Sequence, residues 1–534
     1  MPQKITLKLR PSEAANEAII KELLAKTTGK NTTAVSGYHI LKRSVDARAK
    51  STWINLTLNA FIDEPFRQRM VREFQFRDIS NAQKKVVITG AGPAGLFAAL
   101  QLIELGIKPI ILERGKEVRA RRRDLAILHK EGILNTESNY CFGEGGAGTY
   151  SDGKLYTRSN KRGDIDRVLN LFVRFGAEEN ILYEAHPHIG TNKLPDIITA
   201  IRQLITGCGG EFIFEQKVTD FIIENENIVC LKTTDGNSFR GDAYILATGH
   251  SARDIFNLLH HKKILIEARP FALGVRIEHP QSLIDHIQYK CTDRLAQLLP
   301  PASYSLAAQA NGPGVFSFCM CPGGIIAPAS TSPGELVVNG WSPSKRNNPF
   351  ANSGIVVQVG MEDAYKELKE REMSNGQSFC LNQKDPLLMM HFQQMVEQKC
   401  FDAGGGKFVA PAQRMADFTT GKYSSSVPSS SYLPGLQSVQ LNETLPHFIY
   451  APLAAAFNAF GKKMKGYFTN EAVILATESR TSSPVRIPRS PETLAHPQIK
   501  NLYPCGEGAG YAGGIMSAAM DGERVAKQLA EIII

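Results

Sequence analysis

The sequence lacks three features that would indicate a secreted or membrane protein. No apolar run reaches the ~20 residues that a membrane-spanning helix needs. The first ten residues, MPQKITLKLR, lack the apolar core of a signal peptide. The nine cysteines contain no Cys-x-x-Cys pair and are odd in number, so neither a metal site nor a disulfide framework is expected. Together these absences predict a cytoplasmic protein with reduced thiols, no bound metal and no membrane partner.

The composition is that of an ordinary globular protein. Apolar residues make up 43% and charged residues 21% of the 534 residues, which are too many for one core. The net charge of +9 comes from dispersed Lys and Arg, so we do not expect nucleic acid to bind. No internal repeat is present, and the sequence leaves the oligomeric state unknown.

Residues 4–62 are expected to form a small α+β unit. KITLKLR alternates as a strand does, and a helix follows that Ser12 could cap and that ends before Gly29. Two further strands, YHILKRSVDARAK and WINLTLNAFID, complete a β-α-β-β order. The charged residues 63–84 are predicted to be a linker.

Residues 85–113 have the pattern of a dinucleotide-binding βαβ unit. KVVIT and KPIILE are short apolar strands, and LFAALQLIEL between them is a helix. In the turn GAGPAG, Gly90 permits the sharp bend, Gly92 lets the backbone approach a pyrophosphate, and Gly95 lets the helix pack closely. Glu113 lies 18 residues past Gly95, as expected for a carboxylate that binds ribose hydroxyls. The unit predicts a dinucleotide but does not choose between NAD and FAD.

Two later segments favour FAD. Residues 502–507 read as a short strand followed by Gly506 and Glu507, and a helix begins near Gly514. This arrangement resembles the flavin motif of many FAD oxidoreductases, in which strand-Gly-Asp holds the ribitol chain, with Glu507 here replacing the Asp. The positive end of the following helix would stabilise a reduced flavin. Ala247-Thr248-Gly249 resembles the segment that closes many two-dinucleotide folds.

The glycine-rich stretch FGEGGAGTYSDGKL, residues 142–155, is expected to lie beside the flat cofactor. We predict the following cofactor-binding residues: Gly90, Gly92, Pro93, Ala94, Gly95, Glu113, Arg114, Gly148, Ser151, Asp152, Gly153, Val218, Ala247, Thr248, Gly249, Gly506, Glu507, Gly513, Gly514 and Ile515. No residue is assigned a catalytic role.

Four other segments allow more than one interpretation. Of the arginines in RARRR (119–123), one could pair with a cofactor phosphate and the rest form a solvated face. Cys319 and Cys321 could be a redox pair, but no cation is near them in sequence and buried structural thiols are favoured. ESRTSSPVR (478–486) could bind an anion or form a surface loop. Arg276 and Glu278 would share a strand face, as a salt bridge or a catalytic pair.

Several long strings together resemble a bacterial family of FAD-dependent proteins labelled NAD(FAD)-utilizing dehydrogenases. They are GEGGAGTYSDGKL, FCMCPGG, NGWSPSKRN, SRTSSPVRI and PCGEGAGYAGGIMSAAMDG. The resemblance spans nearly the whole chain. It implies bound FAD in a two-domain flavoprotein body with an N-terminal appendage, and it implies no particular substrate.

The sequence therefore predicts an α/β fold in which a Rossmann-like FAD/NAD(P)-binding domain carries an inserted α+β substrate domain and a small N-terminal α+β domain. The expected ranges are 1–83 for the N-terminal domain and linker, 84–264 and 471–534 for the FAD-binding domain, and 265–470 for the substrate domain. The expected activity is that of an FAD-dependent oxidoreductase that moves hydride between flavin N5 and a small-molecule substrate. NAD(P)H is a candidate transient co-substrate, although no second GxGxxG follows a strand. The alternatives are an RNA-modifying or RNA-binding flavoprotein and a flavin-binding regulator.

Overall fold

The structure is a computed structural model that describes every residue except 1, 50, 158–162, 291–296, 311 and 376–381. Two of the nine cysteines, Cys291 and Cys380, lie outside the described residues. The seven in the described part of the chain are free thiols.

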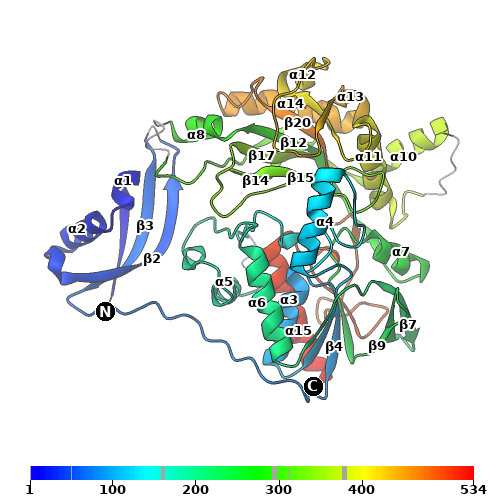
Figure 1. Cartoon of the computed structure of the whole chain (residues 1–534), viewed down its shortest axis with the longest axis horizontal. Helices are drawn as coiled ribbons and strands as arrows, with labels where there is room; N and C mark the ends of the chain where they lie inside the picture. The colour runs from blue at the N-terminus through cyan, green and yellow to red at the C-terminus, as the bar shows by residue number, and fades with distance from the viewer. Residues whose placement is uncertain (1, 50, 158–162, 291–296, 311, 376–381) are drawn as a thin grey trace.

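An antiparallel three-stranded sheet with two helices forms the N-terminal unit, which projects from the rest of the molecule (Figure 1). The strands are ordered β1-β3-β2. This confirms the predicted β-α-β-β unit. Its elements are β1 (Gln3–Leu9), α1 (Pro11–Ala14), α2 (Glu17–Thr28), the 3-10 turn η1 (Thr32–Ala34), β2 (Val35–Asp46) and β3 (Trp53–Ile62).

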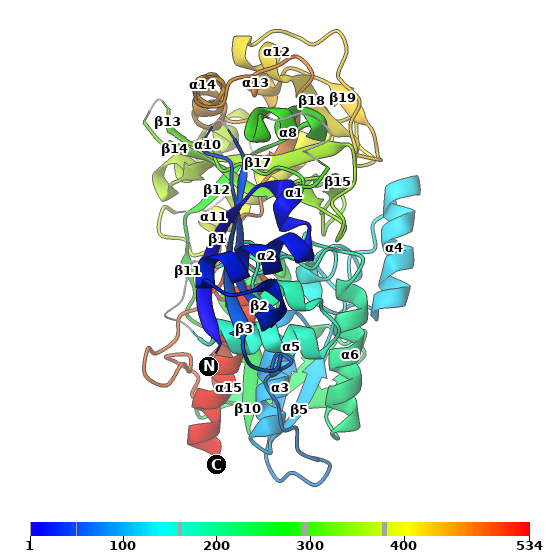
Figure 2. The same cartoon turned by 90° about the vertical axis from the view of Figure 1, so that its left-hand side faces the viewer.

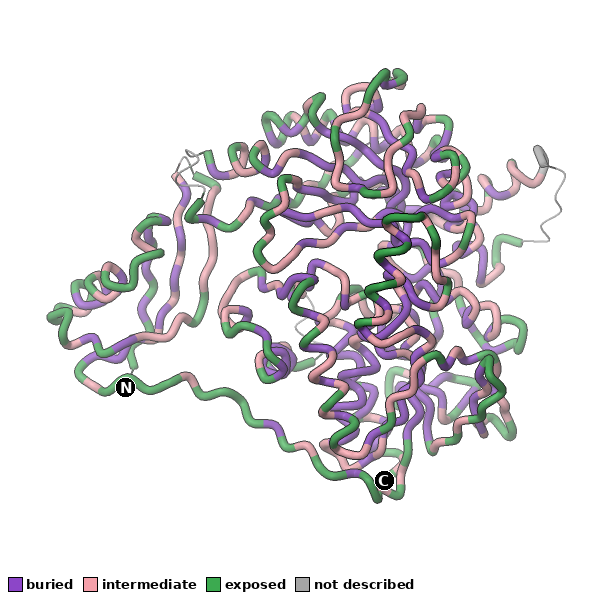
Figure 3. The backbone as a smooth tube through the Cα atoms, in the orientation of Figure 1, coloured by how far each residue is buried: buried purple, intermediate pink, exposed green. Residues whose placement is uncertain are grey.

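The long helix of this unit, α2, begins later than predicted. Asn16, not Ser12, caps it, because the Asn16 side chain accepts hydrogen bonds from the backbone N–H groups of Ala18 and Ile19. Gly29 ends the helix with a φ of +66°, as its position suggested. Residues 63–84, all of them described, contain neither helix nor strand and run along the surface, mostly exposed (Figure 3).

A five-stranded parallel sheet in the order β22-β10-β4-β5-β6 forms the base of the main body. Its strands are β4 (Lys85–Thr89), β5 (Lys108–Leu112), β6 (Glu211–Ile213), β10 (Ala243–Leu246) and β22 (Leu502–Pro504). They are short and apolar because both faces are covered. The first βαβ unit and the C-terminal strand thus meet in one sheet, and the fold is the predicted Rossmann-type α/β class.

Helices cover one face of this sheet, and a small antiparallel sheet and one helix cover the other. The helical face has α3 (Pro93–Glu104), α5 (Ile165–Arg174), α6 (Leu194–Gly207) and α15 (Ile515–Ile533). The other face has β7 (Val218–Glu224), β8 (Asn227–Thr233), β9 (Ser238–Phe239) and α7 (Arg253–His261). Helix α4 (Val118–Glu131) and the 3-10 turns η2 (Gly146–Gly148) and η3 (Glu179–Leu182) lie in the connections.

A second sheet of seven strands, ordered β13-β14-β17-β12-β20-β18-β19, lies at the other end of the main body (Figure 2). All its pairs are antiparallel except β18 with β19. The strands are β12 (Phe271–Pro280), β13 (Ala307–Gln309), β14 (Gly314–Cys321), β17 (Phe350–Val359), β18 (Ala410–Arg414), β19 (Leu436–Ser438) and β20 (Val473–Glu478). Two small ribbons are β11 (Glu267–Ala268) with β21 (Val485–Arg486), and β15 (Ile325–Pro328) with β16 (Val338–Trp341).

The helices of this second part are α8 (Gln281–Tyr289), α10 (Met361–Asn375), α11 (Leu388–Ala403), α12 (Met415–Thr420), α13 (Leu441–Thr444) and α14 (His447–Lys463). Strand β20 pairs with β12 and β18, so residues just after 470 contribute to the large sheet. How the chain divides into domains stays a prediction.

Candidate functional site

A cavity of about 400 Å³ lies where the strands of the parallel sheet end. Thr89, Leu112 and Ala247 line it at the ends of β4, β5 and β10, as ligand sites do in open α/β sheets. Of the predicted cofactor residues, all but Gly95 and Gly506 line this one cavity: Gly90, Gly92, Pro93, Ala94, Glu113, Arg114, Gly148, Ser151, Asp152, Gly153, Val218, Ala247, Thr248, Gly249, Glu507, Gly513, Gly514 and Ile515.

Gly95 and Gly506 shape the site from behind its wall. A Cβ on Gly95 would lie 2.1 Å from the carbonyl oxygen of Gly90, so only glycine lets α3 pack this close to its own turn. Gly506 has a φ of +74°, and its N–H donates to a carboxylate oxygen of the buried Asp521 on α15 at 2.8 Å. Both glycines therefore position backbone that other residues present to the cavity.

The turn from β4 into α3 presents bare backbone to the cavity. Gly90 has a φ of +105°, and a Cβ there would meet the carbonyl oxygen of Ala247 at 2.5 Å. Gly92 caps α3, and a Cβ on it would meet no atom within 4 Å. The open space in front of Gly92 is at the positive end of a helix, which attracts anionic groups such as phosphate.

Glu113 is buried at the end of β5, and backbone donors surround it. One carboxylate oxygen accepts from the N–H groups of Gly115 and Gly143, both at 2.9 Å, and the other from Ala91 N–H at 2.9 Å. A carboxylate offers about four acceptor positions. Glu113 thus ties three loop segments together and keeps capacity for one further donor, such as a ribose hydroxyl.

Only one arginine of the RARRR run is buried. Arg121 on α4 donates to the carbonyl oxygens of four loop residues and to the hydroxyl of Thr149. It does not line the cavity, so the expected pairing with a cofactor phosphate is wrong for this residue. Arg119, Arg122 and Arg123 are exposed, as the solvated-face interpretation predicts. Arg121 instead holds the glycine-rich loop in shape.

Arg114 lines the cavity, and two carboxylates compensate its positive charge. It pairs with Glu137 at 2.7 Å and Asp254 at 2.9 Å, and its guanidinium stacks 4.1 Å from the centre of the Phe142 ring. Burial opposes its positive charge, but these carboxylates raise the pKa of Arg114 overall. It can contact a ligand by stacking and through its remaining N–H groups.

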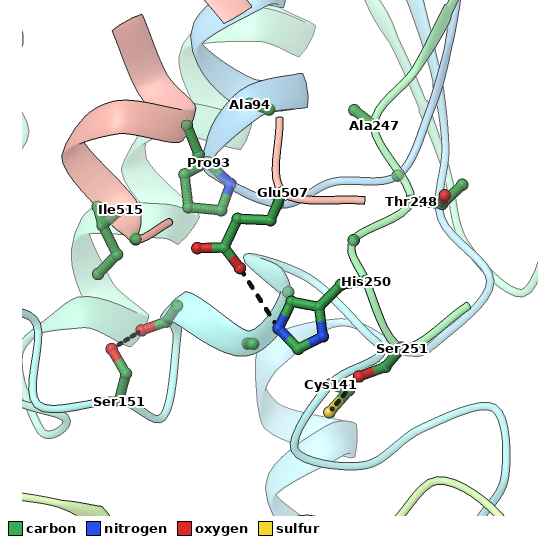
Figure 4. Close-up of a pocket in the computed structure, with 18 of the residues that line it drawn as sticks. Pro93, Ala94, Cys141, Ser151, Ala247, Thr248, His250, Ser251, Glu507 and Ile515 are labelled. Carbon is green, nitrogen blue, oxygen red and sulfur yellow. Dashed lines mark hydrogen bonds and ion pairs between the residues drawn. The ribbon is translucent and has the colours of Figure 1, made fainter. Parts of the chain in front are cut away.

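The C-terminal segment also lines the cavity, through Glu507 and the residues at the start of α15. Figure 4 shows Ile515 beside Pro93, so the first turns of α15 and α3 lie close together, while Glu507 points toward His250. Glu507 Oε2 lies 3.5 Å from His250 Nε2. Burial raises the pKa of Glu507 and lowers that of His250 to about 4. At neutral pH His250 is therefore uncharged and suited to hydrogen bonding.

Two thiols of β14 lie beside a lysine from the glycine-rich loop. Lys154 Nζ is 3.7 Å from Cys319 Sγ and 3.9 Å from Cys321 Sγ, and it also donates to the Met320 carbonyl oxygen. Cys319 and Lys154 line the cavity. The interpretation of both cysteines as merely structural rested on the lack of a nearby cation, and the fold supplies one from a distant segment.

The remaining expectations for charged residues need two corrections. Arg276 pairs with Glu478 at 2.7 Å rather than with Glu278, which accepts a hydrogen bond from the backbone N–H of Ser431. Arg480, in the segment ESRTSSPVR, lines the cavity but is buried against Glu397 at 3.1 Å. A buried ion pair compensates each arginine, so neither is a free anion-binding group.

Sequence reasoning missed several residues of the site. His250 directly follows the Ala-Thr-Gly segment, and Lys154 follows Gly153, so both were adjacent to predicted residues. Asp521 was given no role, because its partner Gly506 lies 15 residues earlier, before the helix that carries Asp521. Among the described residues, no helix combines the length and apolar character needed to cross a membrane.

Comparison with known proteins agrees with this architecture. Residues 270–481 match the family model of the C-terminal domain of FAD-dependent proteins, and residues 1–61 match a domain of unknown function. An uncharacterised protein of Clostridium beijerinckii is 36% identical over 531 residues, covering 96% of each chain. The FAD-dependent monooxygenase DEP2 of Fusarium langsethiae is 26% identical over 35% of each chain.

Two solved structures show a distant likeness. The tetracycline destructase Tet(51) has a TM-score of 0.33 at 12% identity, covering 84% of this chain and 82% of its own. A salicylate hydroxylase bound to its substrate has a TM-score of 0.33 at 13% identity, covering 85% and 80%.

The Rossmann-type sheet, its glycine-lined cavity and the family model matched over residues 270–481 define the class: this is an FAD-dependent protein. Within that class, the chain belongs to the same family as the uncharacterised Clostridium beijerinckii protein, which it matches over nearly its full length.

Proposed function

We propose that the protein is an FAD-dependent oxidoreductase that moves hydride between flavin N5 and a small-molecule substrate, with NAD(P)H as a transient donor. The resemblance of several sequence strings to the NAD(FAD)-utilizing dehydrogenases supports this proposal. The matched family model describes FAD dependence and does not favour the RNA-modifying alternative.

One observation carries the proposal: four glycines of the cavity face open space. A Cβ added to Gly92, Gly249, Gly513 or Gly514 would meet no protein atom within 4 Å, and all four line the same cavity. A ligand that needs close backbone approach at both ends of a long site explains this. FAD, with a pyrophosphate and a planar ring, is such a ligand.

The lining residues suggest where each part of the cofactor would lie. Gly92 and the start of α3 would hold the pyrophosphate, and Glu113 would accept from a ribose hydroxyl. Gly514 and the start of α15, whose first turn lies close to that of α3, would face the flavin pyrimidine, with Glu507 near the ribitol chain. The helix terminus there places positive potential where a reduced flavin is anionic. When bound, the flavin supplies the two-electron chemistry.

The test is anaerobic titration of the flavin-loaded protein with NADH and, separately, NADPH, while the flavin absorbance is recorded. Stoichiometric bleaching by one of them is expected and identifies the donor. A flavin that both nicotinamides leave oxidised but that dithionite bleaches contradicts the NAD(P)H part of the proposal. A purified protein that neither carries nor takes up FAD contradicts the cofactor assignment itself.

A further inference from the structure

Cys319, which lines the cavity, and Cys321 are brought together by an irregularity in β14. The pairing of β14 with β17 shifts register between Phe318 and Cys321, and Cys319 has a φ of +46°. Such a bulge turns side chains out of their regular alternation. As a result the sulfur atoms of Cys319 and Cys321 both lie within 3.9 Å of Lys154 Nζ.

The charges around this thiol pair favour one negative charge on it. Lys154, Arg276 and Arg346 are positive; Asp152, 2.8 Å from Arg346 and 3.8 Å from Lys154, and Glu478, 2.7 Å from Arg276, are negative. These three cations outnumber the two carboxylates paired with them by one, which leaves one positive charge beside the thiols, on a Lys154 side chain that is 36% exposed. A thiolate would neutralise this charge.

The two thiols differ in their tendency to ionise. A hydrogen bond from Cys321, then Lys154 and Arg276, lower the pKa of Cys319 well below the usual value, although burial opposes this. The same hydrogen bond and burial raise the pKa of Cys321. Glu507 also faces Cys319, and a negative charge on it opposes a thiolate; burial raises the pKa of Glu507. A thiolate beside a protonated thiol is the resting state of a redox dithiol.

We propose that Cys319 and Cys321 form a redox-active dithiol whose substrate is a small-molecule disulfide. Cys319 lines the cavity and is the nucleophile, and Cys321, which is fully buried, is the resolving thiol. Lys154 is a positioning residue that holds the thiolate. The inference rests on the proposed function in one respect: the electrons that regenerate the dithiol come from the cofactor.

The exchange balances in two steps. The Cys319 thiolate attacks one sulfur of the substrate disulfide, which breaks the substrate S–S bond, forms a mixed disulfide and releases one thiolate. Cys321 then attacks Cys319 Sγ, forms the internal disulfide and passes its proton to the second leaving sulfur, released as a thiol. The substrate gains two electrons and the pair loses two. Two electrons and one proton would restore the resting thiolate and thiol, and the reduced cofactor, when bound, would supply them.

The test follows the thiols directly and needs no turnover. Reduced protein is treated with 2-hydroxyethyl disulfide at neutral pH, the released thiol is measured, and the modified peptides are identified by mass spectrometry. We expect an internal Cys319–Cys321 disulfide in the wild type. Cys321→Ser should stop at the mixed disulfide on Cys319 and release half as much thiol. Cys208→Ser, which removes a partly exposed thiol remote from the cavity, should behave as the wild type does.

A second measurement stays informative if a variant fails to fold. The rate of iodoacetamide alkylation at each cysteine of the wild type is recorded against pH. The Cys319 rate should stay level as the pH falls below 9, whereas the Cys208 rate should drop about tenfold per pH unit, because burial raises the pKa of Cys208. Lys154→Met should move the Cys319 profile to higher pH.

Two results would overturn the inference: a Cys319 profile that follows that of Cys208, or a wild type that forms no internal disulfide. Both measurements are made with and without added FAD, and bound flavin is quantified separately by absorbance. A protein that binds no FAD but forms the internal disulfide contradicts the proposed function alone. A protein that binds FAD and has inert thiols contradicts the dithiol alone.

Discussion

Gly92 at the N-cap of α3 and Gly95 in its first turn allow cofactor binding and folding to be tested separately. Gly92 has a φ of −76° and a ψ of −178°, which alanine adopts freely, and its Cβ would enter empty space. Gly92→Ala should change the unfolding free energy of the cofactor-free protein by less than about 1 kcal/mol, the cost of a poorer N-cap. The added methyl group would displace a phosphate from the backbone N–H groups. Each hydrogen bond to a charged group contributes about 1.5–3 kcal/mol, so FAD affinity should fall about 10- to 100-fold.

Gly95→Ala is the matched control, because it adds the same methyl group one helical turn away. Its Cβ would lie 2.1 Å from the Gly90 carbonyl oxygen, so it should destabilise the cofactor-free protein by about 1–3 kcal/mol or more through overpacking. Fluorescence titration with FAD and urea unfolding of both cofactor-free variants measure the two effects. The reasoning is refuted if Gly92→Ala binds FAD as the wild type does, or if Gly92→Ala loses as much stability as Gly95→Ala.

Three further changes test the framework of the site. Glu113→Gln places an amide N–H₂ against backbone donors and should lower the thermal midpoint of unfolding, because each buried N–H left unpaired costs about 1–3 kcal/mol. A midpoint equal to that of the wild type would contradict this. Arg121→Met should lower the unfolding free energy in urea by at least about 2 kcal/mol, because several buried carbonyl oxygens lose their donor. An unchanged urea midpoint would show that the loop keeps its shape without Arg121. Burial lowers the pKa of His279 to about 4, so the folded protein binds fewer protons than the unfolded chain below about pH 6.5, and stability falls as pH drops from there toward 4. His279→Gln should flatten this part of the acid-unfolding curve, and an equally steep curve would speak against the assignment.

The glycine-lined cavity was predictable from sequence because its walls are local features in a fixed chain order. A glycine turn after a short apolar strand has few alternatives, since only glycine satisfies both the φ of +105° at Gly90 and the close approach at Gly95. Parallel strands end at one edge of their sheet, so motifs some 400 residues apart, at Gly92 and Gly514, had to meet there. The second strand-glycine-helix segment therefore indicated that its glycines would lie near those of the first.

Side-chain partners were much less predictable, because pairing depends on which strands become neighbours. The period of a strand places Arg276 and Glu278 on one face, yet Arg276 binds Glu478 across the β12–β20 pair. Likewise, the sequence gives no reason to expect that Arg121, within a run of exposed arginines, would be the one that turns inward. Arg121 turns inward because its guanidinium makes five hydrogen bonds to a loop that begins 18 residues later in the chain.

At the thiol pair Cys319 and Cys321, a local sequence motif and a long-range side-chain contact act together. From the Cys-x-Cys string alone, two structural thiols are expected. The cation that changes this expectation, Lys154, lies 165 residues before Cys319 and cannot be found from the string. Yet Lys154 follows Gly153, one of the glycines predicted to line the cofactor cavity, and its position is therefore determined by the same loop that shapes that cavity. A shift of this loop relative to β14 would change the distance between the ammonium group and the two sulfur atoms. We therefore predict that cofactor binding changes the alkylation rate of Cys319, and an equal rate with and without bound FAD would contradict this coupling.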